Sequence, residues 1–401
     1  MVITSCNLCG SDKLSIIIDL RYHPLADTFV KEAQLREPET RYPLRVLLCE
    51  DCGHAMSQYD VPPSVRYQEN EYSYDSANSK VSIAHFGEMA NEIIGKVGIG
   101  KDDLVVDIGS NVGTLLEAFR TKSACQVLGI EPAPNMVAKA LQNNVPTVPD
   151  FFNKRSADKI LEIKKAKAIT ITNAFNHISN LEEFMTQIAR TLDPAGAFVI
   201  EAPYLAHLVE KTAFDTIYLE HVSYFAVTPL VPFFKRFGLI ITDLYENEYM
   251  GGSVRIYVSK TVSQSPKVDE YIAREKRMGL FSLETYRELM TRVAGFKQAL
   301  VFSLYEAKKN GGRIIGIGAA TKGNTLLNYC GIDSTLLDFV TDASAYKIGK
   351  YTPGSHILIQ PDEAITNEIT HALILPWNIA LFLKEKLGSK FPSMNFIIPH
   401  I

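Results

Sequence analysis

The stretch Leu104-Val-Val-Asp107-Ile-Gly109-Ser-Asn-Val-Gly113 sets the architecture that we expect for this chain of 401 residues. The apolar residues around Asp107 predict a buried strand, and a helical pattern starts directly after Gly113. Gly109 permits a tight turn, and Gly113 lets the helix begin close to a bound ligand. A strand, a glycine turn and a helix in this order open a Rossmann-like sheet.

Strands and helices alternate along the chain around this turn. The candidate strands are Leu104–Ile108, Gln126–Ile130, Lys167–Thr172 and Ala197–Glu201. The candidate helices are Val81–Val97, Thr114–Thr121, Asn135–Asn143 and Leu181–Leu192. This rhythm predicts an α/β fold with a parallel, doubly wound sheet. Two further β-rich runs, Leu239–Tyr245 and Ser253–Ser259, are candidates for an antiparallel pair.

A second alternating unit lies near the C-terminus. Its first strand candidate, Arg313–Ile317, leads into the glycine-rich turn Gly316–Gly323, after a long helical region at Val268–Asn310. Further strands are expected at Leu337–Thr341, Ala372–Leu375 and Phe396–Pro399. This pattern predicts a second, smaller Rossmann-like domain. We expect three units, at residues 1–66, 67–245 and 246–401.

The first unit carries a metal-ligand pattern. Four of the six cysteines form two pairs, Cys6-x-x-Cys9 and Cys49-x-x-Cys52, and a glycine follows each pair. Two such knuckles predict a closed, tetrahedral zinc site with a structural role. Disulfides or redox-active pairs are the alternative interpretation. A module this short buries little apolar surface, which is a physical reason for a metal.

Composition limits the function. A net charge of -4 and the absence of a clustered Lys/Arg excess argue against general nucleic-acid binding. No apolar run is long enough to span a membrane, and the first residues do not resemble a secretory signal. We expect a cytoplasmic protein with no membrane partner, acting as a monomer or weak dimer.

Acidic residues follow the expected strands of the first Rossmann-like unit. Asp107 could bind an ammonium group, Glu131 could accept the hydroxyls of a ribose, and Asp150 with Phe151 suits an adenine. The set resembles the S-adenosylmethionine site of class I methyltransferases. The residues that we assign to this cofactor are Asp107, Gly109, Asn111, Gly113, Glu131, Asp150, Phe151 and Asn173.

The segment Asp215–Phe225 carries a second group of reactive side chains. Tyr218, Glu220 and His221 combine a phenol, a carboxylate and an imidazole, which are suited to moving protons. A polar helix start or a buried structural network is the alternative interpretation. His85 and His177 are expected to be structural or rim residues.

Together these motifs resemble the S-adenosylmethionine-dependent C-methyltransferases that act on nucleotide-linked 4-keto-deoxysugars, nearly end to end. The matching features are the four cysteines, Tyr72–Ser76, Asp107–Gly113, Glu201–Tyr204, Tyr218–His221, Gly251–Arg255 and Lys322–Thr325. The resemblance implies that a base removes the proton at C3 of a nucleoside-diphosphate-4-keto-6-deoxysugar. The resulting enolate carbon then accepts the methyl group.

The resemblance also implies roles for individual residues. His221 matches the base, with Glu220 and Tyr218 beside it, and either Tyr72 or Tyr74 faces the sugar. One departure is Met250, where the family often has histidine, so no role is carried over to that position. Whether Glu220 or a tyrosine assists His221 stays open at this stage.

The C-terminal domain is expected to hold the nucleotide of the substrate. Its glycine-rich turn offers backbone amides and Lys322 to a diphosphate, and Asp342 could contact a ribose or base. We assign substrate contacts to Tyr204, Tyr224, Arg255, Lys322, Asn324 and Asp342. Alternative functions are an O- or N-methyltransferase on another small molecule and a keto-sugar epimerase or binding protein.

Overall fold

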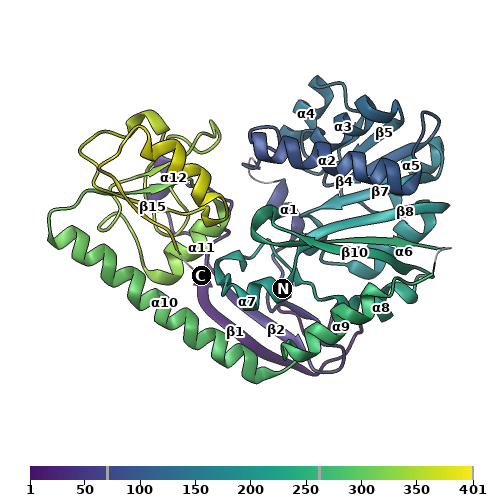
Figure 1. Ribbon diagram of the computed structural model, residues 1–401, viewed down its shortest axis with the longest axis horizontal. Coiled ribbons are helices and arrows are strands. Elements are labelled where there is room, and N and C mark those ends of the chain that lie inside the picture. The colour runs from purple at the N-terminus through teal and green to yellow at the C-terminus, as the bar shows by residue number, and fades with distance from the viewer. Residues whose placement is uncertain (69–71, 261–262, 400–401) are drawn as a thin grey trace.

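The computed structural model describes residues 1–68, 72–260 and 263–399 and contains three β-sheets (Figure 1). A seven-stranded sheet and a five-stranded sheet form two lobes, and a four-stranded sheet lies below and between them. The predicted α/β fold, with a small N-terminal module and two Rossmann-like units, is confirmed.

The seven-stranded sheet has the order β10-β11-β8-β7-β4-β5-β6. Its strands are β4 (Leu104–Ile108), β5 (Gln126–Ile130), β6 (Thr147–Val148), β7 (Ala166–Thr172), β8 (Leu192–Pro203), β10 (Ile240–Asn247) and β11 (Ser253–Ser259). The strands from β4 to β8 are parallel, whereas β11 runs antiparallel to both β8 and β10. The expected antiparallel pair is therefore present at one edge of the sheet.

Helices cover both faces of this sheet, which explains its continuous apolar strands. Val105 packs with α2 and α3 on one face, and Val106 packs on the other face with α5, α6 and α8. The helices are α2 (Lys80–Val97), α3 (Thr114–Ser123), α4 (Pro134–Gln142), α5 (Lys154–Ile163), α6 (Leu181–Thr191), α7 (Leu205–Glu210) and α8 (Val227–Lys235). Ser79 caps the start of α2 and the left-handed Gly98 ends it.

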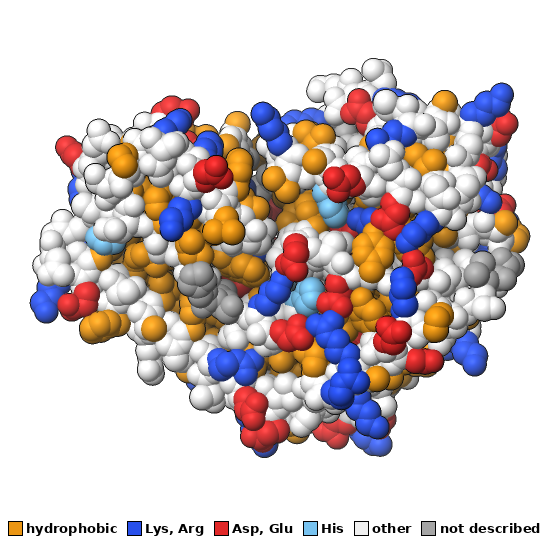
Figure 2. Space-filling view, viewed as in Figure 1, with side chains coloured by type: hydrophobic (Ala, Val, Ile, Leu, Met, Phe, Trp, Pro, Cys, Tyr) orange, Lys and Arg blue, Asp and Glu red, His pale blue; other side chains and the backbone are white. Residues whose placement is uncertain are grey.

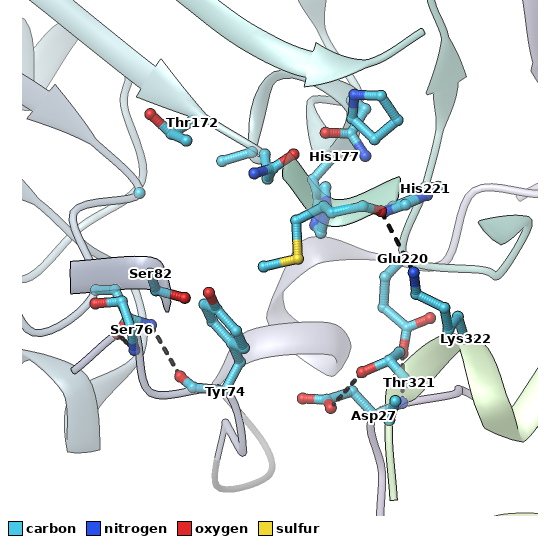
Figure 3. Close-up of a pocket in the computed structure, with 18 of the residues that line it drawn as sticks. Asp27, Tyr74, Ser76, Ser82, Thr172, His177, Glu220, His221, Thr321 and Lys322 are labelled. Atoms are coloured by element: carbon cyan, nitrogen blue, oxygen red, sulfur yellow. Dashed lines mark hydrogen bonds between the residues drawn. The ribbon is translucent and has the colours of Figure 1, made fainter. Parts of the chain in front are cut away.

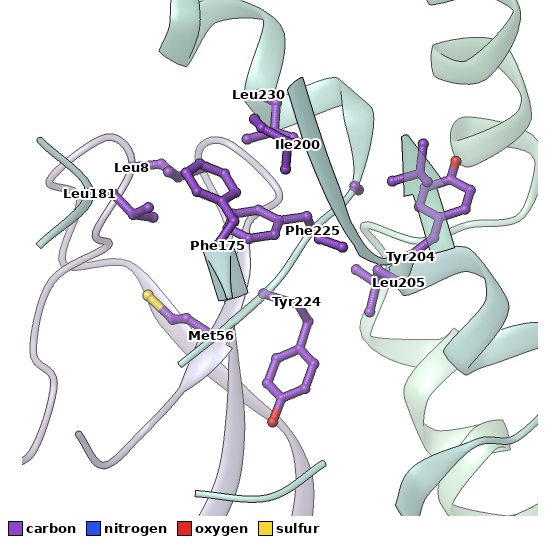
Figure 4. Packing of buried hydrophobic residues seen from close by; sticks show 14 of the residues in the cluster. Leu8, Met56, Phe175, Leu181, Ile200, Tyr204, Leu205, Tyr224, Phe225 and Leu230 are labelled. Atoms are coloured by element: carbon purple, nitrogen blue, oxygen red, sulfur yellow. The ribbon is translucent and has the colours of Figure 1, made fainter. Parts of the chain in front are cut away.

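The N-terminal sheet is antiparallel, in the order β1-β2-β3-β9. Its strands are β1 (Leu14–His23), β2 (Tyr42–Cys49), β3 (Ala55–Ser57) and β9 (Ser223–Tyr224). The last strand belongs to the predicted catalytic segment, and Tyr224 pairs there with Ala55. Figure 4 shows Leu8 and Met56 of the module packed near Phe175 and Phe225, so the two units share one core.

The C-terminal sheet is fully parallel, in the order β14-β13-β12-β15-β16. Its strands are β12 (Ile314–Ile317), β13 (Val340–Thr341), β14 (Ile359–Gln360), β15 (His371–Ile374) and β16 (Asn395–Ile397), with helices α11 (Thr321–Cys330) and α12 (Ala380–Gly388). The expected long helical region forms two helices, α9 (Lys267–Arg277) and α10 (Leu283–Lys309). They are separated by a turn in which Gly279 has φ +66°.

Short helices complete the chain. They are α1 (Pro63–Tyr67) and the 3-10 helices η1 (Glu32–Arg36), η2 (Phe175–His177), η3 (Phe214–Thr216), η4 (Tyr249–Gly251), η5 (Asp362–Ala364) and η6 (Trp377–Ile379).

The division of the chain into units at 66/67 and 245/246 stays a prediction, and β10 and β11 pair across its second boundary. Within the described ranges, no helix is long and apolar enough to cross a membrane. The cytoplasmic location and the oligomeric state also stay predictions.

Candidate active site

A cavity of about 1330 Å³ lies between the seven-stranded and five-stranded sheets. Figure 2 shows the molecule hollowed between its two lobes, with hydrophobic side chains along the walls. Fifteen sequence-predicted site residues line this cavity: Tyr72, Tyr74, Asp107, Gly109, Asn111, Glu131, Phe151, Asn173, Tyr204, Tyr218, Glu220, His221, Tyr224, Lys322 and Asp342. The structure therefore brings the expected cofactor, catalytic and nucleotide residues into one space.

Asp107 lies at the carboxyl end of β4, at the cofactor end of the cavity. Its side chain is buried and accepts a hydrogen bond of 2.7 Å from Thr170 Oγ1 on β7. Burial raises the pKa of Asp107 to about 7, and the nearby Glu131 acts in the same direction. A cationic group such as an ammonium would favour the ionised form of this carboxyl.

Glu131 directly follows β5, beside the glycine turn Asp107–Gly113. Backbone N–H groups hold its carboxylate. The N–H groups of Asn111 and Ala133 each donate to its carboxylate at 2.8 Å. Burial raises the pKa of Glu131 to about 7. The outer lone pairs of this carboxylate remain suited to the hydroxyl groups of a ribose.

Asn111 connects the segment Tyr72–Ser76, hereafter the tyrosine segment, to the glycine turn Asp107–Gly113 by hydrogen bonds. Its backbone has φ +53°, a conformation that asparagine adopts more readily than most residues. Its side chain accepts from Ser76 N at 3.0 Å and donates to Tyr74 O at 2.9 Å. The segment that carries Tyr72 and Tyr74 consequently lies across the glycine turn.

The residues at this end fit S-adenosylmethionine. Two buried carboxyl groups suit its ammonium and ribose, and Asn173 Oδ1 and Ser110 Oγ are buried without a partner among the described residues. A Cβ on Gly109 would lie 2.9 Å from the Cβ of Ala174, so only glycine fits this turn. Unsatisfied buried oxygen atoms are costly, and a bound ligand would satisfy them.

His221 lies in the wall of the cavity, across from Tyr74 and Ser76 (Figure 3). Its Nδ1 is 2.8 Å from the carbonyl oxygen of Thr216, and its ring centroid is 3.7 Å from that of Tyr218. A carbonyl only accepts hydrogen bonds, so Nδ1 carries the proton and Nε2 keeps a free lone pair. Burial lowers the pKa of His221 to about 3, which keeps the imidazole neutral at ordinary pH.

Glu220 precedes this histidine and is also buried. One carboxyl oxygen accepts from the backbone N–H of Asp27 at 2.9 Å. The other oxygen is buried without a partner among the described residues. Burial raises the pKa of Glu220 to about 7, so a protonated carboxyl is available to donate a hydrogen bond.

Residues of and near α1 contact the segment that carries Glu220 and His221. They were not identified as site residues from the sequence. The Arg66 guanidinium donates to the carbonyl oxygens of His177 and Glu220, both at 3.1 Å. The Tyr67 hydroxyl is hydrogen-bonded to His177, whose ring centroid lies 5.0 Å from that of His221. His177 therefore faces the cavity beside His221. The carbonyl oxygen of Val61 accepts from Arg66 at 2.9 Å.

The C-terminal lobe forms the wall of the cavity that faces the lobe of the seven-stranded sheet. Lys322 donates to Asn378 Oδ1 at 2.8 Å and to Met250 O at 3.3 Å, and its ammonium lies 4.5 Å from the Trp377 ring centroid. Burial lowers the pKa of Lys322 to about 8, although Asp215 acts in the opposite direction. This half-buried cation lines the same cavity as His221.

Four assigned residues do not line the cavity: Gly113, Asp150, Arg255 and Asn324. A Cβ on Gly113 would meet Val145 at 2.8 Å, so this glycine serves packing at the start of α3. Asp150 accepts from Arg155 Nε at 2.8 Å and is turned toward α5.

Arg255 and Asn324 are engaged in contacts between elements. Antiparallel pairing of β11 with β8 places Arg255 opposite Glu201, and its Nε donates to that carboxylate at 2.7 Å. Asn324 donates to Ala26 O of the N-terminal module at 2.7 Å. Tyr204 lines the cavity, but its hydroxyl donates to Glu275 at 2.8 Å.

The four cysteines of the N-terminal module meet as predicted. Their sulfur atoms all lie within 4.8 Å of one another, and the Cys6–Cys52 and Cys9–Cys49 pairs are 3.6 Å apart. Sulfurs around a tetrahedral zinc with bonds of about 2.3 Å would be about 3.8 Å apart, so the cluster fits zinc. The structure contains no disulfide between these cysteines.

Comparisons with known proteins agree with this geometry. Three family models match: a zinc binding domain over residues 6–67, a methyltransferase domain over 89–244 and a C-methyltransferase C-terminal domain over 248–399. The C-methyltransferase NovU of Streptomyces niveus is 30% identical over 383 residues, which cover 94% of this chain and 90% of NovU.

Solved structures share lower similarity. An S-adenosylmethionine-dependent methyltransferase from Clostridium acetobutylicum is 11% identical and has a TM-score of 0.36, covering 46% of this chain and 94% of that one. The magnesium protoporphyrin IX methyltransferase of Synechocystis, solved with bound cofactor, is 12% identical and has a TM-score of 0.34. It covers 45% of this chain and 82% of that one.

Proposed function

This chain belongs to the C-methyltransferase family that includes NovU, and we propose that it methylates C3 of a nucleoside-diphosphate-4-keto-6-deoxyhexose. Its activity is that of an S-adenosylmethionine-dependent C-methyltransferase, with a zinc ion in the N-terminal module. The proposal concerns the substrate, the reacting carbon and the residues that activate it.

The tautomer of His221 is the observation that carries the proposal. Because Thr216 O accepts the Nδ1 proton, Nε2 is the atom that can take a proton from C3. A hydrogen α to a ketone is weakly acidic, so its removal needs a positioned base and stabilisation of the developing enolate. The C3–H bonding electrons move into the enolate, and the proton is held on His221.

Hydrogen-bond donors in the cavity wall are available to a developing enolate oxygen. Burial raises the pKa of Tyr218 and Tyr72 well above 10, so both phenols stay protonated. The protonated Glu220 carboxyl and the Lys322 ammonium line the same cavity. Such donors stabilise negative charge strongly in a site that excludes water.

The cofactor and the enolate carbon meet without a protein nucleophile. When bound, S-adenosylmethionine supplies an electrophilic methyl group, which carbon C3 accepts. The residues that would hold the cofactor are Asp107, Glu131, Asn111 and Asn173. Holding the reacting groups in line contributes several kcal/mol, within the range of about 7–11 kcal/mol for ideal orientation.

The C-terminal wall suits the nucleotide of this substrate. Lys322 offers a positive charge to a diphosphate, and Asp342, directly after β13, offers an acceptor for ribose hydroxyls.

The test is incubation with methyl-labelled S-adenosylmethionine and a panel of nucleotide-linked 4-keto-6-deoxysugars, followed by mass spectrometry and carbon NMR. His221→Asn is expected to lower kcat at least 100-fold, because loss of a general base costs about 100- to 10,000-fold. Glu220→Gln, which keeps a donor, should retain more activity. His371→Asn on β15, outside the cavity lining, is the matched control.

Each product distinguishes a function. Label on C3 that is lost in the His221 variant supports the proposal. Label on C5, the other carbon next to the ketone, would keep the enolate chemistry and move the reacting carbon. Label on oxygen or nitrogen would replace C-methylation of a keto sugar by another methyl transfer. Solvent hydrogen exchange without methylation would favour an epimerase.

A further inference from the structure

The side chain of Asp27 lies where the three units of the protein meet, and the proposed reaction does not use it. Asp27 belongs to the loop between β1 and β2 and lines the cavity (Figure 3). One carboxylate oxygen, Oδ1, accepts from Ser73 Oγ at 2.7 Å and from Thr321 Oγ1 at 3.0 Å. A single atom therefore joins the tyrosine segment to the first residue of α11.

The position of Ser73 makes this contact relevant to the reaction. Ser73 lies between Tyr72 and Tyr74, two of the tyrosines that line the cavity. Its backbone N–H also points to Asp27 Oδ2, at 3.4 Å. Any displacement of the Asp27 carboxylate consequently moves the backbone that aims both phenols.

The same loop also holds Glu220 and α11. The backbone N–H of Asp27 donates to Glu220 at 2.9 Å, and Ala26 O accepts from Asn324 Nδ2 at 2.7 Å. Asn324 is buried on α11, two residues after Lys322 on the same helix. The loop is thus bonded to the catalytic segment on one side and to the C-terminal lobe on the other.

We propose that Asp27 is a positioning residue that ties the nucleotide-binding end of α11 to the tyrosine segment and Glu220. This inference rests on the proposed function for its substrate, but the clamp itself is a property of the ligand-free protein. Binding energy from a nucleotide remote from the reacting carbon is thereby used to align the groups around that carbon.

The first experiment compares Asp27→Ala with wild type. We expect kcat for methyl transfer to fall about 10- to 100-fold, as for loss of hydrogen bonds to a charged group. The affinity for S-adenosylmethionine should change less than about twofold, because the hydrogen bonds of Asp27 go to Ser73, Thr321 and Glu220 rather than to the residues assigned to the cofactor. Asp27→Asn keeps an acceptor oxygen and should restore most of kcat. Glu37→Gln, an exposed residue of the same loop, is the control.

Ser73→Ala and Thr321→Val test the two bonds separately. Each should lower kcat, and each should have little further effect in the Asp27→Ala background, because all three changes remove the same clamp. Strictly additive losses would overturn the proposal. A lower melting temperature with unchanged kcat would assign Asp27 to stability alone.

A pH profile separates positioning from stability. The charge of Asp27 raises the pKa of Glu220, whereas the charge of Arg66 lowers it. The charge of Glu220 also acts on the titratable side chains of Tyr67, Tyr218 and Tyr224, and His221 is the next residue in the chain. Asp27→Asn removes a negative charge, so a limb of the kcat profile that follows Glu220 should move to lower pH. The same limb should be absent in Glu220→Gln, with or without Asp27→Asn.

Hydrogen exchange of the ligand-free protein gives a readout that needs no substrate. Amides of residues 73–76 should exchange faster in Asp27→Ala than in wild type, while those of β4 stay unchanged. Equal exchange in the two proteins would overturn the clamp. Failure of wild type to methylate any sugar would instead count against the proposed function.

Discussion

The two Rossmann-like sheets each open with a strand, a glycine turn and a helix, yet they present opposite charges to the cavity. In the first, Gly109 has φ +70° and no room for a Cβ beside Ala174. In the second, Gly318 has φ +79° and is closed in the same way by Pro376. Both lobes therefore use a glycine with positive φ and no room for a Cβ at the turn after the first strand.

The side chains at the strand ends make the difference. The first turn is flanked by the buried carboxyl groups of Asp107 and Glu131, whereas the second is followed by the half-buried ammonium of Lys322. Carboxyl groups suit an ammonium and a ribose, and an ammonium suits a diphosphate. A glycine turn thus marks where a ligand approaches, and the neighbouring charges set which ligand it is.

Among the substitutions that distinguish the two turns, Glu131→Ala is expected to cause the largest loss of ligand affinity. Loss of a charged acceptor that also organises Asn111 and Ala133 should weaken S-adenosylmethionine binding about 100-fold. Binding of a nucleoside diphosphate should not change. Calorimetric titration with each ligand measures both, and Glu117→Ala, on the exposed face of α3, is the control. Equal losses for the two ligands would contradict separate subsites.

Lys322→Gln probes the second turn. Removing its charge should raise KM for the nucleotide sugar about tenfold, because a charged hydrogen bond to phosphate is lost. Cofactor affinity should be retained. Steady-state kinetics with each substrate varied in turn measure the split, and Lys309→Gln at the exposed end of α10 is the control. A loss confined to kcat would place Lys322 at the enolate instead of the diphosphate.

The two subsites should also respond to pH in opposite directions. Asp107 and Glu131 have pKa values raised to about 7 by burial, so cofactor binding should weaken as pH falls below 7 and these groups become protonated. Lys322 has a pKa lowered to about 8, so nucleotide binding should weaken as pH rises above 8. The affinity for each ligand should be measured between pH 5.5 and pH 9, which extends about one unit beyond each pKa value. If one subsite held both ligands, the two affinities would change with pH in the same direction.

Asp342→Asn should give the smallest effect. Its carboxylate already accepts from Ser344 N at 2.8 Å and lies 3.8 Å from Lys347 Nζ, and the amide keeps one acceptor oxygen. We expect KM for the nucleotide sugar to rise about two- to fivefold, as for a neutral hydrogen bond worth about 1 kcal/mol or less. A change of more than about tenfold would mean that the carboxylate binds the ribose directly.

The residues at strand ends could be predicted because local sequence places them. Asp107 lies near the end of β4 and Glu131 directly follows β5, and the carboxyl ends of neighbouring parallel strands meet at one edge of a sheet. The cysteine pairs could be predicted because their spacing alone fits a metal site. His221 and Glu220 followed from the resemblance of their segment, and the structure places both in the cavity.

Other residues depended on contacts that the sequence pattern does not reveal. Arg255 was assigned to the substrate, but cross-strand pairing with Glu201 holds it in a separate buried network. Asp27 and Arg66 reach the centre from loops and a short helix without periodicity. The partners that connect them to the centre, Ser73 for Asp27 and His177 for Arg66, lie more than 40 residues away along the chain, so no local pattern could identify them.

The sequence by itself determined the α/β architecture, the two glycine turns and the metal knuckles, because strand periodicity, glycine geometry and ligand spacing are local properties. Only the tertiary structure decided which face each reactive side chain presents. The choice of His221 Nε2 as the free lone pair depends on the carbonyl of Thr216, and the Asp27 clamp depends on three units meeting. Both are set by packing between distant segments, where burial and hydrogen bonding fix orientation and charge together.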